Sequence, residues 1–189
     1  MTFFVRLYYI LYMRTKKSSD GQKPPSFIEL ARRAQFIECA IETIATLGYA
    51  QASLAQIARR ASISKSVIAY YFTSKEELIE QVVTEIYTTA VRAVTPQITM
   101  QPTAQLRLQA YIRSAVGYIG AHRLRMMALR EIALNFRTAE GELRYGGISE
   151  EWILTALEAL LRQGQEDGEF RAFNTRVMAV TIRRAIDAV

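Results

Sequence analysis

The sequence has little of what catalytic and metal sites are built from. Its 189 residues include one cysteine, Cys39, and one histidine, His122. A single cysteine forms no internal disulfide, and chains made for an oxidising compartment usually carry several. So few sulfur and nitrogen ligands provide no set for zinc or another transition metal, and few groups for acid–base or thiol catalysis. We expect no catalytic residue, no metal and no cofactor, and a cytoplasmic location.

Glycine, proline and enzyme motifs are scarce as well. Nine glycines and four prolines exclude collagen-like and low-complexity chains. A hydrophobic content of 50% excludes an intrinsically disordered chain. The sequence holds no GxGxxG, P-loop, HExxH or GxSxG pattern, each of which marks a common class of enzyme. The composition therefore favours a globular protein that is not an enzyme.

The positive charge is concentrated near the N-terminus. The formal net charge is +6. Residues 1–25 carry five basic side chains and one acidic one, residues 26–76 carry six and four, and residues 77–189 carry thirteen of each. A basic first part suits a polyanion such as nucleic acid or an anionic membrane surface.

The first twelve residues, MTFFVRLYYILY, differ from the rest in composition. They are too short for a membrane span, which needs about 20 apolar residues, and no signal-peptide cleavage site follows. Three interpretations stand: Met13 is the true start, the segment packs on the body as an extra strand or helix, or it is a weak membrane-surface anchor. The last gives an alternative function, a helical membrane-surface or scaffold protein. Deleting residues 1–12 distinguishes the two functions: a DNA-binding protein should keep its DNA binding, whereas a membrane-anchored protein should lose its localisation.

From Ser26 onward the pattern is helical. Ser26 and Glu29 form a capping box, and Gly48 is placed to end the helix in a left-handed conformation. Between them, apolar residues recur at intervals of three and four, and we expect them to be buried: Leu30, Ala34, Ile37, Ile41 and Ile44.

Further caps and breaks divide the remaining chain. Ser53, Ser64 and Ser74 are N-cap candidates, and Pro96 and Pro102 predict a break. We expect helices over residues 53–60, 64–71, 74–93, 103–120, 122–136, 148–163 and 174–189. Beyond the first twelve residues no alternating pattern competes, so the predicted fold class is all-α.

Two of these helices are about two turns long and would be unstable alone. Residues 53–60 and 64–71 are best explained as a helix-turn-helix packed on the helix before them, in which the second helix presents its N-terminal residues to the DNA major groove. Small polar side chains at Ser64 and Ser66 fit there. An ordinary helical hairpin is the alternative.

Four segments then carry a resemblance to the DNA-binding domain of the tetracycline-repressor (TetR) family. They are Leu47-Gly48-Tyr49, the stretch SLAQIARRA at 53–61, ISKSVIAYYF at 63–72 and SKEEL at 74–78. The resemblance implies a three-helix DNA-binding domain at 26–76 after an N-terminal extension and basic arm at 1–25. A helical ligand-binding and dimerisation domain would follow at 77–189. The chain departs from the family at Ser62, where the turn glycine is usual and either a strained backbone or a different turn is expected, and at Ser66 and Ala69.

By resemblance, eight residues contact DNA. Ser53, Tyr71 and Lys75 would lie on phosphates, and the groove residues would be Ser64, Lys65, Ser66, Val67 and Tyr70. Phe72 is expected in the core. Basic residues of the arm, Arg14, Lys16 and Lys17, either extend the phosphate contacts or form a solvated tail.

The C-terminal part is predicted to sense an effector and to form a homodimer through residues 148–163 and 174–189. Candidate pocket residues, each of which plain core packing explains as well, are Tyr111, Tyr118, Met126, Met127, Phe136 and Trp152. Arg123, Arg125 and Arg130 either face an anionic ligand or pair with Glu131 and similar neighbours. His122 is expected to cap a helix, and Cys39 to be buried and inert.

The resulting hypothesis is a transcriptional regulator, a ligand-released repressor that binds double-stranded DNA at a palindromic operator. Its effector is an unknown small molecule, and it has no membrane partner. At Val189 the chain is expected either to be truncated or to fray.

Overall fold

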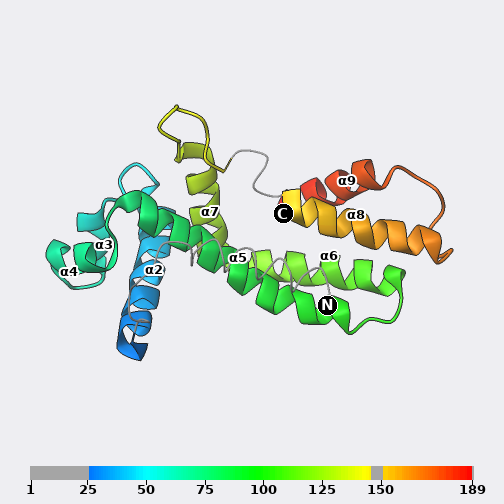
Figure 1. The fold of residues 1–189 in the computed structure, drawn as a ribbon, viewed down its shortest axis with the longest axis horizontal. Helices are drawn as coiled ribbons and strands as arrows, with labels where there is room; N and C mark the ends of the chain where they lie inside the picture. The colour runs from blue at the N-terminus through cyan, green and yellow to red at the C-terminus, as the bar shows by residue number, and fades with distance from the viewer. Residues whose placement is uncertain (1–25, 146–150, 189) are drawn as a thin grey trace, which may run out of the picture. The chain divides into compact units, whose positions relative to one another are not determined.

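The computed structural model describes residues 26–145 and 151–188. Within these ranges the chain forms eight α-helices and no strand (Figure 1), which confirms the all-α prediction. The interpretations of residues 1–12, of the basic arm at 14–25, of the start at residue 148 and of the end at Val189 concern residues outside the described ones.

The helices follow the predicted order. They are α2 (Phe27–Leu47), α3 (Leu54–Arg60), α4 (Lys65–Tyr71), α5 (Lys75–Thr99), α6 (Ala104–Ala121), α7 (Arg123–Asn135), α8 (Glu151–Glu166) and α9 (Thr175–Asp187).

Capping explains where several helices begin and end. Ser26 and Glu29 form both hydrogen bonds of the predicted capping box at the start of α2. Gly48 ends that helix with φ +81°, where a side chain would be strained. The Ser53 hydroxyl accepts the backbone N–H of Gln56 at 3.2 Å, which fixes the start of α3.

The predicted break lies at its Pro102 end, and the predicted end of the helix at residue 93 is wrong, because α5 continues through Pro96 to Thr99. A proline in a helix interior removes one backbone hydrogen bond and strains the turn before it. Ile98, only 3% exposed, anchors the last turn in a hydrophobic core. That burial offsets the lost hydrogen bond, and the helix ends just before Pro102 rather than before Pro96.

The predicted buried stripe of α2 is wrong over its first half. Leu30 is 52% exposed and Ala34 is exposed too, whereas Ile37, Ile41 and Ile44 are buried as expected. Buried residues begin only at Phe36. Periodicity identifies one face of a helix, but it does not tell how far along the helix that face meets a partner.

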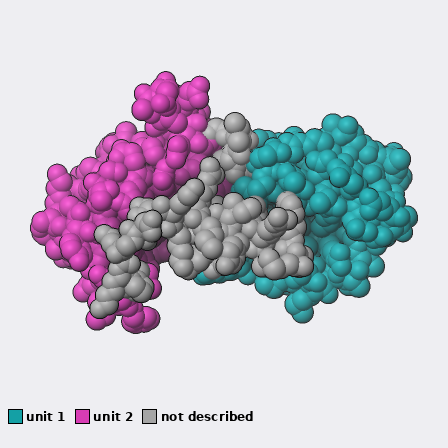
Figure 2. Space-filling model, viewed as in Figure 1, with its two compact units in different colours: residues 1–10, 88–122, 147–189 teal, residues 11–87, 123–146 magenta. Residues whose placement is uncertain are grey.

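The chain folds into two compact units, coloured separately in Figure 2. One, which we call the recognition unit, contains the described residues 26–87 and 123–145 (magenta, unit 2 in Figure 2). The other, which we call the second unit, contains the described residues 88–122 and 151–188 (teal, unit 1 in Figure 2). Packing thus divides the chain differently from the predicted boundary after residue 76. The reason is α7: its buried Ala128 and Ile132, and Phe136 directly after it, lie in the same core as the buried residues of α2 to α5.

The second unit is built from the C-terminal half of α5 with α6, α8 and α9 around a smaller core. Glu169, between α8 and α9, accepts the N–H groups of Ala104 and Gln105 at 3.1 and 2.8 Å and so caps α6. Gly164 lets the Phe170 ring lie against α8, since a Cβ there would be only 2.3 Å from the ring. Among the described helices, none is long and apolar enough to cross a membrane.

Candidate nucleic-acid interface

The two short helices α3 and α4 meet at a tight turn. Ser62, at its centre, has φ +56°, the only positive φ among the described residues other than glycine. The predicted strain at this position is therefore confirmed. The turn is closed by backbone hydrogen bonds from Ser62 N–H to the Arg59 carbonyl at 3.1 Å and from Ile63 N–H to the Ala58 carbonyl at 3.0 Å.

Helix α4 presents almost all of its surface to solvent. Only Ile68 is buried, while Val67 is 40% and Tyr70 75% exposed. Ser64, Lys65 and Ser66 are exposed as well. The predicted groove residues therefore lie together on one accessible helix, as a recognition helix requires.

The N-terminal end of α4 is open. Ser64 makes no side-chain hydrogen bond to the helix backbone. Instead its hydroxyl lies 2.8 Å from that of Ser66. Both hydroxyls thus stand at the exposed start of the helix, where donor and acceptor groups can meet base edges.

The C-terminal end of α4 is fastened by Arg33 of α2. Its guanidinium donates to the Tyr71 carbonyl at 2.5 Å and to the Glu77 carboxylate at 3.1 Å, and it lies 4.5 Å from the centre of the Phe72 ring. Phe72 itself is fully buried, which confirms its predicted place in the core. Sequence reasoning missed Arg33, because its partners lie about forty residues away with no local pattern joining them.

Glu77 completes this fastening. Its carboxylate also accepts the backbone N–H and the hydroxyl of Thr73, both at 2.8 Å. Burial alone would raise the pKa of the Glu77 carboxyl, but the hydrogen bonds from Thr73 and Arg33 outweigh it and hold the pKa below its ordinary value. The ionised carboxylate is therefore part of the turn between α4 and α5.

Two predicted phosphate contacts have internal partners. The Tyr71 ring packs edge-on against Phe36, with ring centres 5.1 Å apart. The Lys75 ammonium donates to the Tyr49 carbonyl at 2.7 Å and lies 4.2 Å from the centre of the Tyr49 ring. Burial lowers the pKa of Lys75. An ammonium has three donors, so the bond to Tyr49 leaves two for another acceptor.

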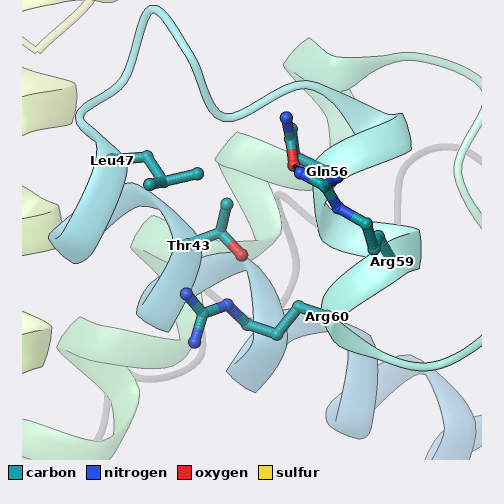
Figure 3. Close-up of a pocket in the computed structure, with 5 residues that line it drawn as sticks. All are labelled: Thr43, Leu47, Gln56, Arg59 and Arg60. Atoms are coloured by element: carbon teal, nitrogen blue, oxygen red, sulfur yellow. Dashed lines mark hydrogen bonds between the residues drawn. The ribbon is translucent and has the colours of Figure 1, made fainter.

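A cleft of about 300 Å³ lies between α2 and α3 (Figure 3). Its lining residues are Thr43, Leu47, Gln56, Arg59 and Arg60. Both arginines have partners within the protein. Arg60 donates to Glu42 at 3.3 Å and to Thr46 at 2.9 Å, and Arg59 to Gln56. The two arginines of the cleft are thus already hydrogen-bonded within the protein. No pattern in the sequence indicated this cleft.

The six candidate pocket residues are divided between the two units. Met126 and Phe136 pack in the core of the recognition unit. Tyr111 and Tyr118 are buried on α6, and Trp152 is half-buried on α8, in the other unit. Met127 is 50% exposed. It lines a groove of about 360 Å³ between α2 and α7, together with Ala45, Gly48, Arg130, Glu131 and Leu134.

Other predicted roles resolve individually. His122 ends α6, with Nδ1 2.9 Å from the Tyr118 carbonyl and its ring stacked on the Tyr118 ring, which confirms its capping role. Arg125 pairs with Glu38 at 2.5 Å rather than with Glu131, because α7 packs on α2. Cys39 is only half-buried, and burial raises its thiol pKa. The described residues hold no cluster of three or more metal-ligating side chains.

Residues 36–82, which contain this helix-turn-helix, match the family model of bacterial regulatory proteins of the tetR family. The transcriptional regulator BetI of Escherichia coli strain S88 is 36% identical over 91 residues, or 47% of each chain. This chain thus spans about half the length of the curated relatives it matches.

Solved structures share the fold over most of the chain. The fatty acid degradation regulator FadR of Bacillus halodurans is 23% identical with a TM-score of 0.71, covering 89% of this chain and 83% of that one. FadR of Bacillus subtilis, solved in complex with stearoyl-CoA, is 24% identical with a TM-score of 0.68, covering 82% and 83%. At such identities the likeness shows a common arrangement of an N-terminal helix-turn-helix followed by further helices.

Proposed function

We propose that this chain, which belongs to the tetR family of bacterial regulatory proteins through the helix-turn-helix at residues 36–82, binds double-stranded DNA as a transcriptional regulator and catalyses no reaction. The observation that carries the proposal is α4: a short helix with one buried residue, open at its start and fastened at its end. Such a helix contributes little to the hydrophobic core, and its accessible side chains are the ones that would enter the major groove of DNA.

The predicted contacts divide into two kinds. The accessible residues of α4 would lie in the groove and read bases: Ser64, Lys65, Ser66, Val67 and Tyr70. The remaining donors of Lys75 would bind phosphates, as would Ser53 and Tyr71 at the rim. Phosphate contacts position a protein without reading sequence, whereas base contacts decide which sequence binds.

Selection from a pool of random 30-base-pair duplexes, about the length that two half-sites require, tests the proposal. We expect the purified protein to enrich a palindrome, with affinity that falls steeply as salt rises. Lys75→Ala should weaken binding to all duplexes alike, and Ser66→Ala should change which duplexes are enriched. Arg171→Ala, at an exposed arginine of the other unit, is the matched control for lost positive charge. Failure of the wild-type protein to enrich any sequence would contradict the proposal.

The proposed assembly is a homodimer through α8 and α9. A palindrome is read by two copies whose recognition helices lie roughly 34 Å apart. Leu157 and Ile186 are buried within one protomer, so a charge there would unfold the unit rather than report on assembly. Val177 on α9 is 61% exposed, so substituting it leaves the core of the protomer intact. We expect light scattering to find a dimer for the wild-type chain and a monomer for Val177→Glu. Gln109→Glu, at an exposed residue of α6 outside the proposed interface, is the control for added charge.

The proposed regulation is release from DNA by a small molecule held in the second unit, near Tyr111, Tyr118 and Trp152. Support comes from the B. subtilis structure of the same fold, which is a complex with stearoyl-CoA. That compound is therefore the first probe to test. If it releases the protein from DNA, saturating DNA must weaken its binding by the same factor, because coupling between two sites is reciprocal. A stearoyl-CoA affinity that saturating DNA leaves unchanged would exclude ligand release through that site.

A protein that regulates transcription must be in the same compartment as the DNA. The proposed function therefore includes the predicted cytoplasmic location. The proposed direction of control is repression, in which the free protein occupies its operator and blocks transcription. A reporter gene placed behind the selected palindrome should be silenced by the protein and restored on deleting it; a reporter that rises with the protein would mark an activator instead.

A further inference from the structure

The turn between α2 and α3 is held by residues from α5 and α7. Tyr49, directly after Gly48, donates its backbone N–H to the Glu131 carboxylate of α7 at 3.1 Å. Its carbonyl accepts the Lys75 ammonium of α5 at 2.7 Å. Both backbone polar groups of Tyr49 are thus bound by charged side chains, which make stronger hydrogen bonds than neutral groups do.

The Tyr49 side chain is held by the same two helices. Its ring stacks on Phe136, the residue just after α7, with ring centres 5.9 Å apart, and the Lys75 ammonium covers the ring at 4.2 Å. One residue of the turn therefore has four contacts, two to α5 and two to the α7 segment.

Gly48 allows the carboxylate to approach. A Cβ at Gly48 would lie 3.3 Å from Oε2 of Glu131, the oxygen that accepts the Tyr49 N–H. Asn135, one turn further along α7, donates its side-chain amide to the Glu131 carbonyl at 2.8 Å. The groove between α2 and α7 leaves Glu131 partly accessible, so the bond to Tyr49 can break without opening the core.

This turn leads directly into the DNA-binding helices. Four residues after Tyr49, Ser53 caps α3, and α3 is joined to α4 through the turn at Ser62. The hydrogen bond from the Tyr49 N–H to Glu131 therefore fixes the segment that leads into the start of α3.

We infer that Glu131 is a positioning residue for DNA binding: through Tyr49 it sets the placement of α3 and α4. The inference rests on the proposed DNA-binding function and adds to it a residue outside α3 and α4 on which their placement depends. Glu131 itself contacts no DNA.

The test compares Glu131→Ala with Glu131→Gln. The glutamine keeps an oxygen that accepts the Tyr49 N–H, whereas the alanine removes it. We expect Glu131→Ala to weaken binding to the duplex selected by the wild-type protein about tenfold, the loss of one charge-assisted hydrogen bond. Glu131→Gln should restore most of that affinity. The salt dependence should stay unchanged in both, because no phosphate contact is lost.

Amide hydrogen exchange of the free protein gives a readout that needs no DNA. In Glu131→Ala the amide of Tyr49 and those of α3 and α4 should exchange faster, while the core amides of α2 and α5 keep their rates. Arg130→Ala, at the neighbouring residue that lines the same groove, is the control and should change neither readout.

Three results would overturn the inference: unchanged exchange at Tyr49 in Glu131→Ala, a duplex affinity equal to wild type, or a glutamine variant as weak as the alanine variant. If the alanine variant is globally destabilised, its core amides will exchange faster too; the inference then requires the amides of Tyr49, α3 and α4 to be accelerated more than the core amides, and equal acceleration would overturn it. Faster exchange in a protein that selects no duplex would sink the proposed function and leave the positioning of α3 by Glu131 intact.

Discussion

Helices α3 and α4 have seven residues each and lie on either side of one turn, yet they are held in opposite ways. Helix α3 is fixed at its start by the Ser53 cap and along its length by buried Ile57 and Ala58. Helix α4 has an uncapped start and one buried residue, and its end is fastened through Phe72 and Arg33. The N-terminal end of α4 is thus accessible because the contacts that stabilise the helix are those of Ile68 and of its C-terminal end.

The largest test of this comparison removes the one buried side chain of α4. Ile68→Ala should lower the free energy of unfolding by about 2–5 kcal/mol, the usual cost of such a cavity. Val67→Ala, at the exposed neighbour in the same helix, should change it by less than about 1 kcal/mol. Urea denaturation measures both. Equal effects would mean that α4 is not anchored through Ile68.

A smaller effect is expected from the fastening at the other end. The pKa of Glu77 is depressed in the folded state, so its carboxylate stabilises the fold above the ordinary glutamate pKa, and this contribution is lost as the pH falls through the folded pKa. Between about pH 7 and about pH 3, wild type should therefore lose more stability than Glu77→Gln.

Glu76→Gln, at the exposed neighbouring carboxylate, provides the matched control, and its stability should follow the wild-type curve. Thermal unfolding across this pH range gives the comparison. A Glu77→Gln curve parallel to wild type would show that the carboxylate charge does not fasten the turn.

The caps of the two helices offer a matched pair of serines. Ser53→Ala removes a hydrogen bond to the helix backbone and should cost about 1 kcal/mol of stability. Ser64→Ala removes no hydrogen bond to the helix backbone, only the contact between the Ser64 and Ser66 hydroxyls, and should change stability little. Because Ser64 stands at the reading end, its substitution should affect DNA selection more than stability. Two equal losses in chemical denaturation would contradict the distinction between the helices.

The smallest effect is a gain. A left-handed conformation costs a residue with a side chain about 1–2 kcal/mol. Glycine avoids this cost, but it also increases the conformational entropy of the unfolded chain, which cancels part of the gain in stability. Ser62→Gly, at φ +56°, should therefore raise stability by about 0.5 kcal/mol. The melting temperature should rise slightly, and a fall would show that the serine side chain makes a compensating contact.

Local features of this molecule were predictable from sequence, and long-range ones were not. Ser26, Gly48 and Ser53 signal helix ends through chemistry that acts within four residues. The strain at Ser62 and the burial of Phe72 followed from the resemblance. The continuation of α5 through Pro96 did not, because it depends on the burial of Ile98 among residues far along the chain.

The candidate site shows the same limit. The accessible residues of α4 could be named from their spacing, since seven residues of helix fix which side chains share a surface. The partners of Lys75 and Arg33 could not, because each bond joins residues at least 26 positions apart. For the same reason no periodicity showed that α7 packs on α2.

The order of the chain through its two units has a consequence for synthesis. The core of the recognition unit is completed by Ala128, Ile132 and Phe136, about forty residues after its first part ends at residue 87. A nascent chain grows by roughly 5–20 residues per second, so the DNA-binding helices emerge seconds before their last buried neighbours. We expect them to stay protease-sensitive on the ribosome until α7 appears, and a fragment ending at residue 87 to lack a stable helix-turn-helix.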